Sequence, residues 1–184
     1  MEITTRKHVR GFTLIETMVA VSLLSIAIVA PMSLTTKSLA AAYYARDQIT
    51  AFHLAQEAIE SVRHLRDHNI LLTALGTPTD ILSGIPLNTL FVVSTLDDSI
   101  DTAACVSGTC TPLQIDPTQT FYGYGSGWTD TRFTRTVQAQ SVSEQDGVPQ
   151  EIRVSVTVSW RTGTFQTRSF TIRQNLYRWV SDAT

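Results

Sequence analysis

The fold is decided by the stretch Arg6-Lys7-His8-Val9-Arg10-Gly11-Phe12-Thr13-Leu14-Ile15-Glu16, which apolar residues follow almost without a break to Leu34. The stretch changes from basic to apolar at Phe12. The 23 residues from Phe12 to Leu34 would form a helix of roughly 35 Å, long enough to cross the hydrocarbon core of a bilayer. The sequence therefore predicts a membrane-spanning helix whose basic end stays in the cytoplasm.

One acid, Glu16, lies inside the apolar run. An ionised carboxylate at the centre of a bilayer is unfavourable by about 2.5–3.5 kcal/mol, and by less nearer the ends of the span. Because a helix that only anchors the chain has no need of this acid, its presence favours a functional role. The alternative is that the Glu16 carboxylate lies close enough to the headgroups to stay hydrated.

The bulk composition indicates one anchored domain. The chain has 184 residues and a net charge of −2. Without the N-terminal segment, about 150 residues remain for a modest core. The mildly acidic balance excludes a broad positive field that would attract nucleic acid.

The polar leader 1–11 does not match an ordinary secretory signal. Such a signal has an apolar core of about 7–15 residues, followed by small residues at its cleavage site. Here the apolar run is longer, and the most natural small residue for a cut, Gly11, precedes it.

The run Gly11-Phe12-Thr13-Leu14-Ile15-Glu16, behind a basic leader and before an apolar helix, resembles the start of type IV prepilins and pseudopilins. The resemblance is specific over residues 6–34. It implies that a prepilin peptidase cuts between Gly11 and Phe12 and then N-methylates Phe12. It also implies that Glu16 pairs with the free amine of a neighbouring subunit and sets the axial register of assembly. A simple signal anchor is the alternative for this stretch.

Two further expectations accompany the resemblance. Cleavage would remove three basic residues and one acid, which changes the net charge from −2 to −4. Pro31 falls late in the apolar run, where members of the family often carry a proline. It removes one backbone donor and is expected to kink the helix.

The helix is expected to continue to about His68, because residues 39–68 contain no Gly or Pro. Apolar residues recur there at spacings of three or four and predict one buried stripe. That stripe is Ile49, Phe52, Ala55, Ile59 and Val62. Residues 69–86, with two glycines and two prolines, predict an irregular connection.

The C-terminal third predicts an antiparallel meander. Apolar residues at period two mark its central strand: Ile152, Val154, Val156, Val158 and Trp160. Residues 132–142 alternate loosely, and Asp146-Gly147 predicts the hairpin turn between these two strands. Residues 161–164 predict the next turn, and 167–177 the returning strand. Residues 90–96 predict a fourth strand, and residues 97–120 an irregular segment.

The predicted fold class is α+β: a long N-terminal helix, transmembrane in its first half, packed by its second half on a C-terminal antiparallel sheet of three or four strands. This is the pilin-like head that the resemblance implies. The expected divisions are a cleaved leader at 1–11, a transmembrane and filament-core helix at 12–38, and a head at 39–184. The run 154–160 also resembles the PilV-type minor pilins and the I-type minor pseudopilins.

Two cysteines, Cys105 and Cys110, flank a short loop that contains Gly108. A disulfide is favoured because the rest of the chain has the features of an exported protein. A metal pair is the alternative, although no second ligand pair lies close in sequence.

No catalytic motif or cofactor fingerprint is present, and the sequence predicts neither an enzyme nor a resident metal. His64 and His68 are four apart on the predicted helix, but a solvated face explains them. The cluster Asp97, Asp98 and Asp101 leaves calcium as a weaker alternative. Residues 121–128 mix aromatics with glycine and predict a turn that covers the core edge, with a ligand-binding loop as the alternative.

The predicted function is that of a structural subunit of a type IV pilus, or of a type II secretion or competence pseudopilus. Its expected partners are the prepilin peptidase, other subunits, the inner-membrane assembly platform and, before assembly, membrane lipid. It is expected in the cytoplasmic membrane with the head outside, and later in an extracellular or periplasmic filament.

Two other functions stay open. The head could be a filament-tip binding module, for adhesion or DNA capture, that uses loops 97–130. Nucleic acid is disfavoured by the acidic charge, but a local basic strip is conceivable and would consist of Arg132, Arg135, Arg153 and Arg168. An anchored enzyme is the third reading.

Overall fold

The computed structural model describes residues 11–162 and 166–178. The predicted leader and most of the turn predicted at 161–164 lie outside the described residues. The chain forms two compact units, Met1–Ala45 and Arg46–Thr184. Helix α1 (Leu14–Ala74) runs through both of them, and all the strands belong to the second unit.

The strands form one main sheet and two small ones. The main sheet has the antiparallel order β10-β9-β8-β1-β2. Its members are β1 (Leu90–Ser94), β2 (Ser99–Asp101), β8 (Phe133–Gln145), β9 (Val148–Thr162) and β10 (Gln166–Tyr177). The small sheets consist of β3 (Cys105–Val106) with β4 (Thr109–Cys110), and of β5 (Gln114–Ile115) with β6 (Tyr122–Gly123) and β7 (Thr129–Asp130).

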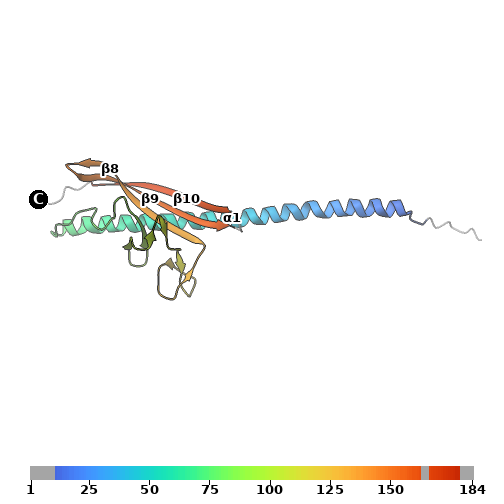
Figure 1. The fold of residues 1–184 in the computed structure, drawn as a ribbon, viewed down its shortest axis with the longest axis horizontal. Helices are drawn as coiled ribbons and strands as arrows, with labels where there is room; N and C mark the ends of the chain where they lie inside the picture. Colours follow the sequence, from blue (N-terminus) through green and yellow to red (C-terminus); the bar gives the residue numbers. More distant parts are fainter. Residues whose placement is uncertain (1–10, 163–165, 179–184) are drawn as a thin grey trace, which may run out of the picture. The chain divides into compact units, whose positions relative to one another are not determined.

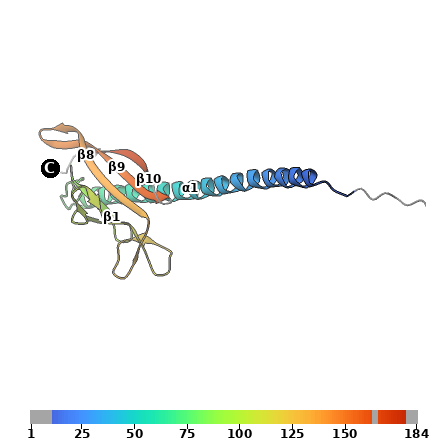
Figure 2. The same cartoon turned by 45° about the vertical axis from the view of Figure 1, so that its right-hand side comes forward.

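The α+β fold predicted from the sequence is confirmed in the second unit. Figures 1 and 2 show β8, β9 and β10 lying along the cyan-to-green part of α1. The alternating apolar residues of β9, from Ile152 to Trp160, are all buried. Asp146 and Gly147 both have positive φ, at 53° and 77°, and form the predicted turn between β8 and β9. The period-two pattern and the turn residues therefore specify the register of this hairpin.

The buried face of the helix differs from the predicted stripe. Ala55, Ile59 and Val62 are buried as predicted, but Ile49 is 59% exposed and Phe52 is 39% exposed. Other residues of α1 take their places in the core, and two of these three are alanines. The additional buried positions are Ala51, Leu54 and Ala58.

The helix also ends later than predicted, at Ala74 instead of about His68. The buried Asn69 side chain donates hydrogen bonds to the Ile81 and Ser83 carbonyls, at 3.1 and 2.9 Å, and so ties the last turns to the following loop. Gly76 then terminates the helix with φ 87°. The Gly76 and Thr77 amides bond back to carbonyls of the last turn, which is the Schellman arrangement.

Residues 97–120 are less irregular than predicted. They contain β2, which pairs with β1 and makes a fifth strand in the main sheet, as well as β3, β4 and β5. These strands have two or three residues each, too few to show a period in the sequence. In the aromatic segment 121–128, Tyr122 and Tyr124 pack against the core, as predicted. The segment is not a turn throughout, because Tyr122–Gly123 forms β6 and pairs with β5.

Candidate processing and assembly segment

Gly11 and Phe12 precede the first turn of α1, and both are exposed, Phe12 at 81%. Among the described residues, a Cβ added at Gly11 would meet no atom within 4 Å, and φ there is not in the left-handed region. The part of the chain that the structure describes therefore gives no packing or backbone reason for a glycine at position 11. An outside requirement, such as the active site of a processing enzyme, would explain the residue.

Thr13 caps the helix that follows. Its Oγ1 accepts the Glu16 amide at 3.3 Å, and its carbonyl accepts the Thr17 amide at 3.2 Å. A threonine at the N-cap with a glutamate three residues later is the sequence signature of a capping box. The sequence reasoning missed this local role, although the Thr-x-x-Glu spacing was available to find it.

The Glu16 carboxylate is exposed in the first turn of α1. Within the described part of the chain it accepts no hydrogen bond and forms no ion pair. A negative charge here interacts favourably with the positive end of the helix dipole, but that interaction leaves its hydrogen-bonding capacity unused. The geometry thus presents an acid that is able to bind a cationic group from another molecule.

Apolar side chains surround this acid and continue along α1. Leu24, Ile26 and Val29 are 60%, 68% and 65% exposed. Pro31 lies inside α1, which continues from Leu14 to Ala74. By length and composition α1 is able to cross a membrane. A helix that is apolar all round belongs in lipid or among other helices.

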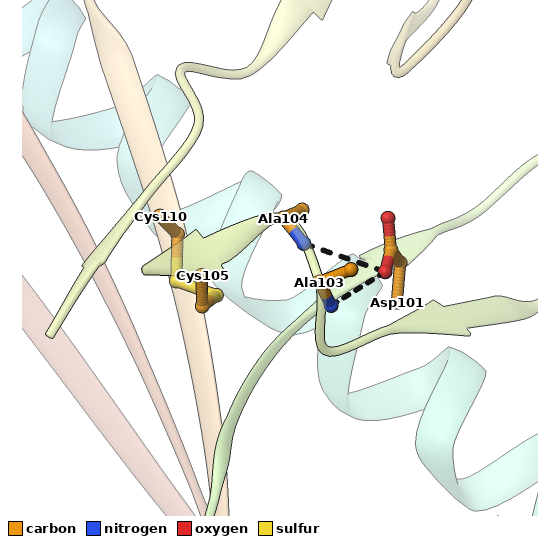
Figure 3. The surroundings of a disulfide bond; sticks show 5 residues. All are labelled: Asp101, Ala103, Ala104, Cys105 and Cys110. Carbon is orange, nitrogen blue, oxygen red and sulfur yellow. Dashed lines mark hydrogen bonds between the residues drawn. A yellow bond between two sulfur atoms is a disulfide. The ribbon is translucent and has the colours of Figure 1, made fainter. Parts of the chain in front are cut away.

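Cys105 and Cys110 form a disulfide, with their Cα atoms 3.9 Å apart as directly opposed residues of the β3–β4 hairpin (Figure 3). Beside it, the Asp101 carboxylate accepts the Ala103 and Ala104 amides at 2.7 and 3.4 Å (Figure 3). The bond closes only a small loop, so it contributes about 2 kcal/mol at most to the stability of the head.

An open groove of about 530 Å³ is lined by the end of β1 and by residues of the segment 97–124. Its lining combines apolar surface with polar side chains, among them Asp97, Asp101, Gln114 and Tyr124. Bonds from the Ser94 and Ser99 hydroxyls lower the pKa of Asp97, and burial raises the pKa of Tyr124. Close by, the Thr118 hydroxyl and the Phe121 amide lower the pKa of Asp116. These carboxylates already serve as acceptors for their own loops.

The metal alternatives gain no support from the geometry. His64 Nδ1 pairs with Asp98 at 2.8 Å. Asp97 accepts the Ser99 hydroxyl at 2.9 Å. Among the residues that the structure describes, no three His, Cys, Asp or Glu side chains are grouped closely enough to hold a metal ion.

The predicted basic strip is wrong at Arg135, which is fully buried. Alternate residues of β8 face the core, and Arg135 lies among them. Its guanidinium donates to the Leu54 carbonyl at 3.1 Å, to the Val93 carbonyl at 2.7 Å and to Glu57 at 3.4 Å. Burial lowers its pKa. This arginine joins α1 to β1 and β8 and is not available to a partner.

Comparison with known proteins supports the resemblance of the N-terminal segment to prepilins. Residues 6–30 match the family model for the prokaryotic N-terminal methylation motif. No curated protein and no solved structure gives a significant match to the chain. The chain therefore carries a type IV prepilin-like cleavage and methylation segment, followed by a pilin-like α+β fold. The motif supports a pilin-like or pseudopilin-like substrate of a prepilin peptidase and points to a structural subunit rather than an enzyme.

Proposed function

We propose that this chain is a filament subunit that is cut between Gly11 and Phe12, N-methylated at Phe12 and assembled through the first half of α1. One observation carries the proposal: the methylation motif at residues 6–30 coincides with an apolar helix that no described part of the chain covers. A membrane holds that surface first, and other subunits cover it after assembly.

Glu16 sets the register between subunits in this proposal. It is the one acid among the exposed apolar residues 12–34, and cleavage before Phe12 would create an amine four positions away on each copy. In a filament interior both charges are unfavourable unless they pair. If two subunits shift by one step of the axial register, the carboxylate and the amine both lose their partner. The register in which they pair is therefore favoured over the adjacent registers.

The functional divisions follow from this scheme. Residues 1–11 are the removed leader, 12–38 the transmembrane and filament-core segment, and 39–184 the head with the second half of α1. Pro31 loosens the helix inside the core segment, because it lacks an amide donor. Cys105 and Cys110 stabilise a surface loop of the head outside the cytoplasm, where disulfides persist.

The particular role proposed is that of a minor pilin or pseudopilin in a type IV pilus or a type II secretion or competence pseudopilus. The resemblance of residues 154–160 to minor subunits, which rests on the sequence pattern alone, favours this choice. Besides the peptidase, other subunits and lipid, the proposed partner is an inner-membrane assembly platform. The assembled filament lies in the periplasm or outside the cell. Quantification of the subunit in purified filaments tests the role: a small fraction of the total is expected, and a majority would exclude a minor subunit.

The mass of the mature N-terminal peptide tests the proposal most simply. Cells that express the chain with a prepilin peptidase should yield a peptide that begins at Phe12 and carries one added methyl group. A matched culture without the peptidase should yield the full leader. A mature end at any other residue would remove the basis of the proposal.

The groove at loops 97–130 favours a second candidate, a filament-tip binding module. Val106 and Phe121 of the same loops do not line the groove, but they are 69% and 55% exposed and offer further apolar surface. Because Arg135 is buried, the basic strip is shorter than the sequence indicated, which weakens DNA as a ligand. A DNA-binding titration of the full chain at several salt concentrations decides this point, since phosphate contacts weaken steeply with salt.

A further inference from the structure

The polar and aromatic residues that follow the apolar run of α1 form a pattern of their own. Lys37 is the first charged residue after Glu16. Tyr43 and Tyr44 follow within two turns, at 52% and 36% exposure. All of these residues lie on one continuous helix, within the first compact unit.

The spacing of the two charges matches the thickness of a bilayer core. From Glu16 to Lys37 the helix advances 21 residues, which is roughly 32 Å at 1.5 Å per residue. The hydrocarbon core of a typical bilayer is about 30 Å thick, and an ordinary helix tilt of about 20° shortens the projected length to nearly that value. An upright or modestly tilted α1 thus places Glu16 at one edge of the core and Lys37 at the other.

The segment between the two charges suits lipid. Residues 17–36 contain no charged side chain. Five of the six hydroxyls there donate to backbone carbonyls three or four residues earlier and so satisfy their own hydrogen-bonding need: Thr17, Ser22, Ser25, Thr35 and Thr36. Such side chains enter hydrocarbon without leaving an unpaired donor.

The two tyrosines fall at the level of the outer headgroups. They lie six and seven residues beyond Lys37, roughly 9–10 Å along the helix. Tyrosine is enriched at this level because the ring is apolar and the hydroxyl is polar. The long Lys37 side chain is able to reach outward from the core edge to the same layer.

We propose that Lys37, Tyr43 and Tyr44 form an outer interfacial anchor, defined by these three residues, that binds lipid headgroups and fixes the depth of the unassembled subunit. This inference rests on the proposed membrane-held state. The anchor keeps Glu16 at the inner headgroup edge, where its carboxylate stays hydrated. Glu16 then meets an apolar environment only when the subunit leaves the membrane for the filament. The need for a counter-ion therefore arises at assembly and not before.

Spin-label depth measurements test the anchor in the full-length chain. The chain is reconstituted in vesicles of phosphatidylethanolamine and phosphatidylglycerol, with single nitroxides at Ser22→Cys, Ile26→Cys, Val29→Cys and Thr36→Cys. The native cysteines do not react because they are joined as a disulfide. Accessibility to oxygen relative to a nickel complex should be greatest at Ile26, midway between the two charges, and should fall toward Thr36.

A triple variant, Lys37→Ala with Tyr43→Ala and Tyr44→Ala, should move the deepest position toward Pro31. The expected shift is about one helical turn, roughly four residues, because the apolar segment then extends to the next charge. Two controls should leave the depth profile unchanged: Tyr43→Trp with Tyr44→Trp, which retains interfacial rings, and Phe121→Ala, which removes an exposed ring from the head.

Two outcomes distinguish a failure of the anchor from a failure of the proposed function. A chain that inserts, with its deepest label away from Ile26 or with no shift in the triple variant, would overturn the anchor and leave the proposed function intact. A chain whose labels are all open to the nickel complex does not enter the bilayer, and that result would overturn both the anchor and the proposed function.

Discussion

The two halves of α1 share one backbone conformation and differ in what covers them. Every side chain that the structure describes from 11 to 45 is exposed. In the second half, by contrast, Ala51, Leu54 and Ala58 are at most 3% exposed beneath the sheet. The exposed half is the more apolar of the two. Because exposed apolar surface is unfavourable in water, the more apolar half of the helix is the one that requires other molecules to cover it. No described part of the chain covers the first half.

The two halves of α1 also differ in how their apolar side chains are distributed around the helix. The second half buries a stripe that includes Ala51, Ala55 and Ala58, and its opposite face is largely polar. The first half is apolar around its whole circumference, which suits lipid or several neighbouring helices. Its only acid lies at the end nearest the predicted cut. The first half is thus suited to move from lipid to contacts with other helices. The second half is suited to stay packed on the sheet of the head.

The largest expected effect is on removal of the leader that precedes the first half of α1. Gly11→Val should leave the leader attached on nearly all chains, because the structure is open around Gly11 and the requirement for a small residue belongs to the peptidase. Mass spectrometry of the membrane fraction measures this. Gly76→Val is the matched control: it strains a left-handed residue in the second half and should still be processed. Normal processing of Gly11→Val would refute the assigned cut.

A large effect confined to the second half is expected at Arg135. Arg135→Ala should lower the free energy of unfolding of the head by about 3–5 kcal/mol, because it leaves a cavity and strips buried carbonyls of their donor. Arg153→Ala, on the exposed face of β9, should change it by less than about 0.5 kcal/mol. Denaturant titration of the detergent-solubilised chain measures both values. Similar values for the two variants would show that the buried guanidinium does not hold α1 on the sheet.

Loss of the disulfide should have a smaller effect. Cys105→Ser with Cys110→Ser should lower the stability of the head by about 2 kcal/mol at most, because the closed loop is short. The same titration measures it, with Ser107→Ala as a control that retains the disulfide and changes a neighbouring side chain. Unfolding of the whole head in the double variant would show that the loop supports more than itself.

The smallest effect is a pH dependence at Asp116. Hydrogen bonds from Thr118 and Phe121 lower the pKa of this carboxyl, so its contribution to stability is present above the unfolded pKa, near 3.9. That contribution is lost as the pH falls through the lower folded-state value. Asp116→Asn should therefore be less stable than wild type at neutral pH, and the gap should close on acidification. Thr118→Val should lie between the two. A gap that does not change with pH would contradict this assignment.

Much of the fold could be predicted from local patterns. The alternation from Ile152 to Trp160 and the Asp146-Gly147 turn gave the central hairpin, because each signal lies within a few adjacent residues. The N-terminal segment was equally readable, since its basic, small and apolar residues occur in a fixed order. These features depend little on distant parts of the chain.

The remaining features depend on contacts between distant residues. The extension of α1 to Ala74 relies on Asn69 bonding to carbonyls that follow it by 12 and 14 residues. The buried Arg135 could have been found from the parity of β8, since Phe133, Val137 and Ala139 mark the same face. Its charge suggested a surface site instead. Strand β2 has no periodic signal, because it has three residues and owes its place to pairing with β1.

The central claim is that the exposed half of α1 assembles with other copies under the control of Glu16, and its most direct test is a competition for incorporation. Glu16→Ala is co-expressed with the wild-type chain, and both are quantified in membranes and in sheared filaments. The account predicts normal insertion and processing, with incorporation reduced about tenfold or more, equivalent to about 1.4 kcal/mol per subunit. Glu60→Ala, which removes an exposed acid from the second half, should incorporate normally. Equal incorporation of Glu16→Ala and wild type would contradict the account.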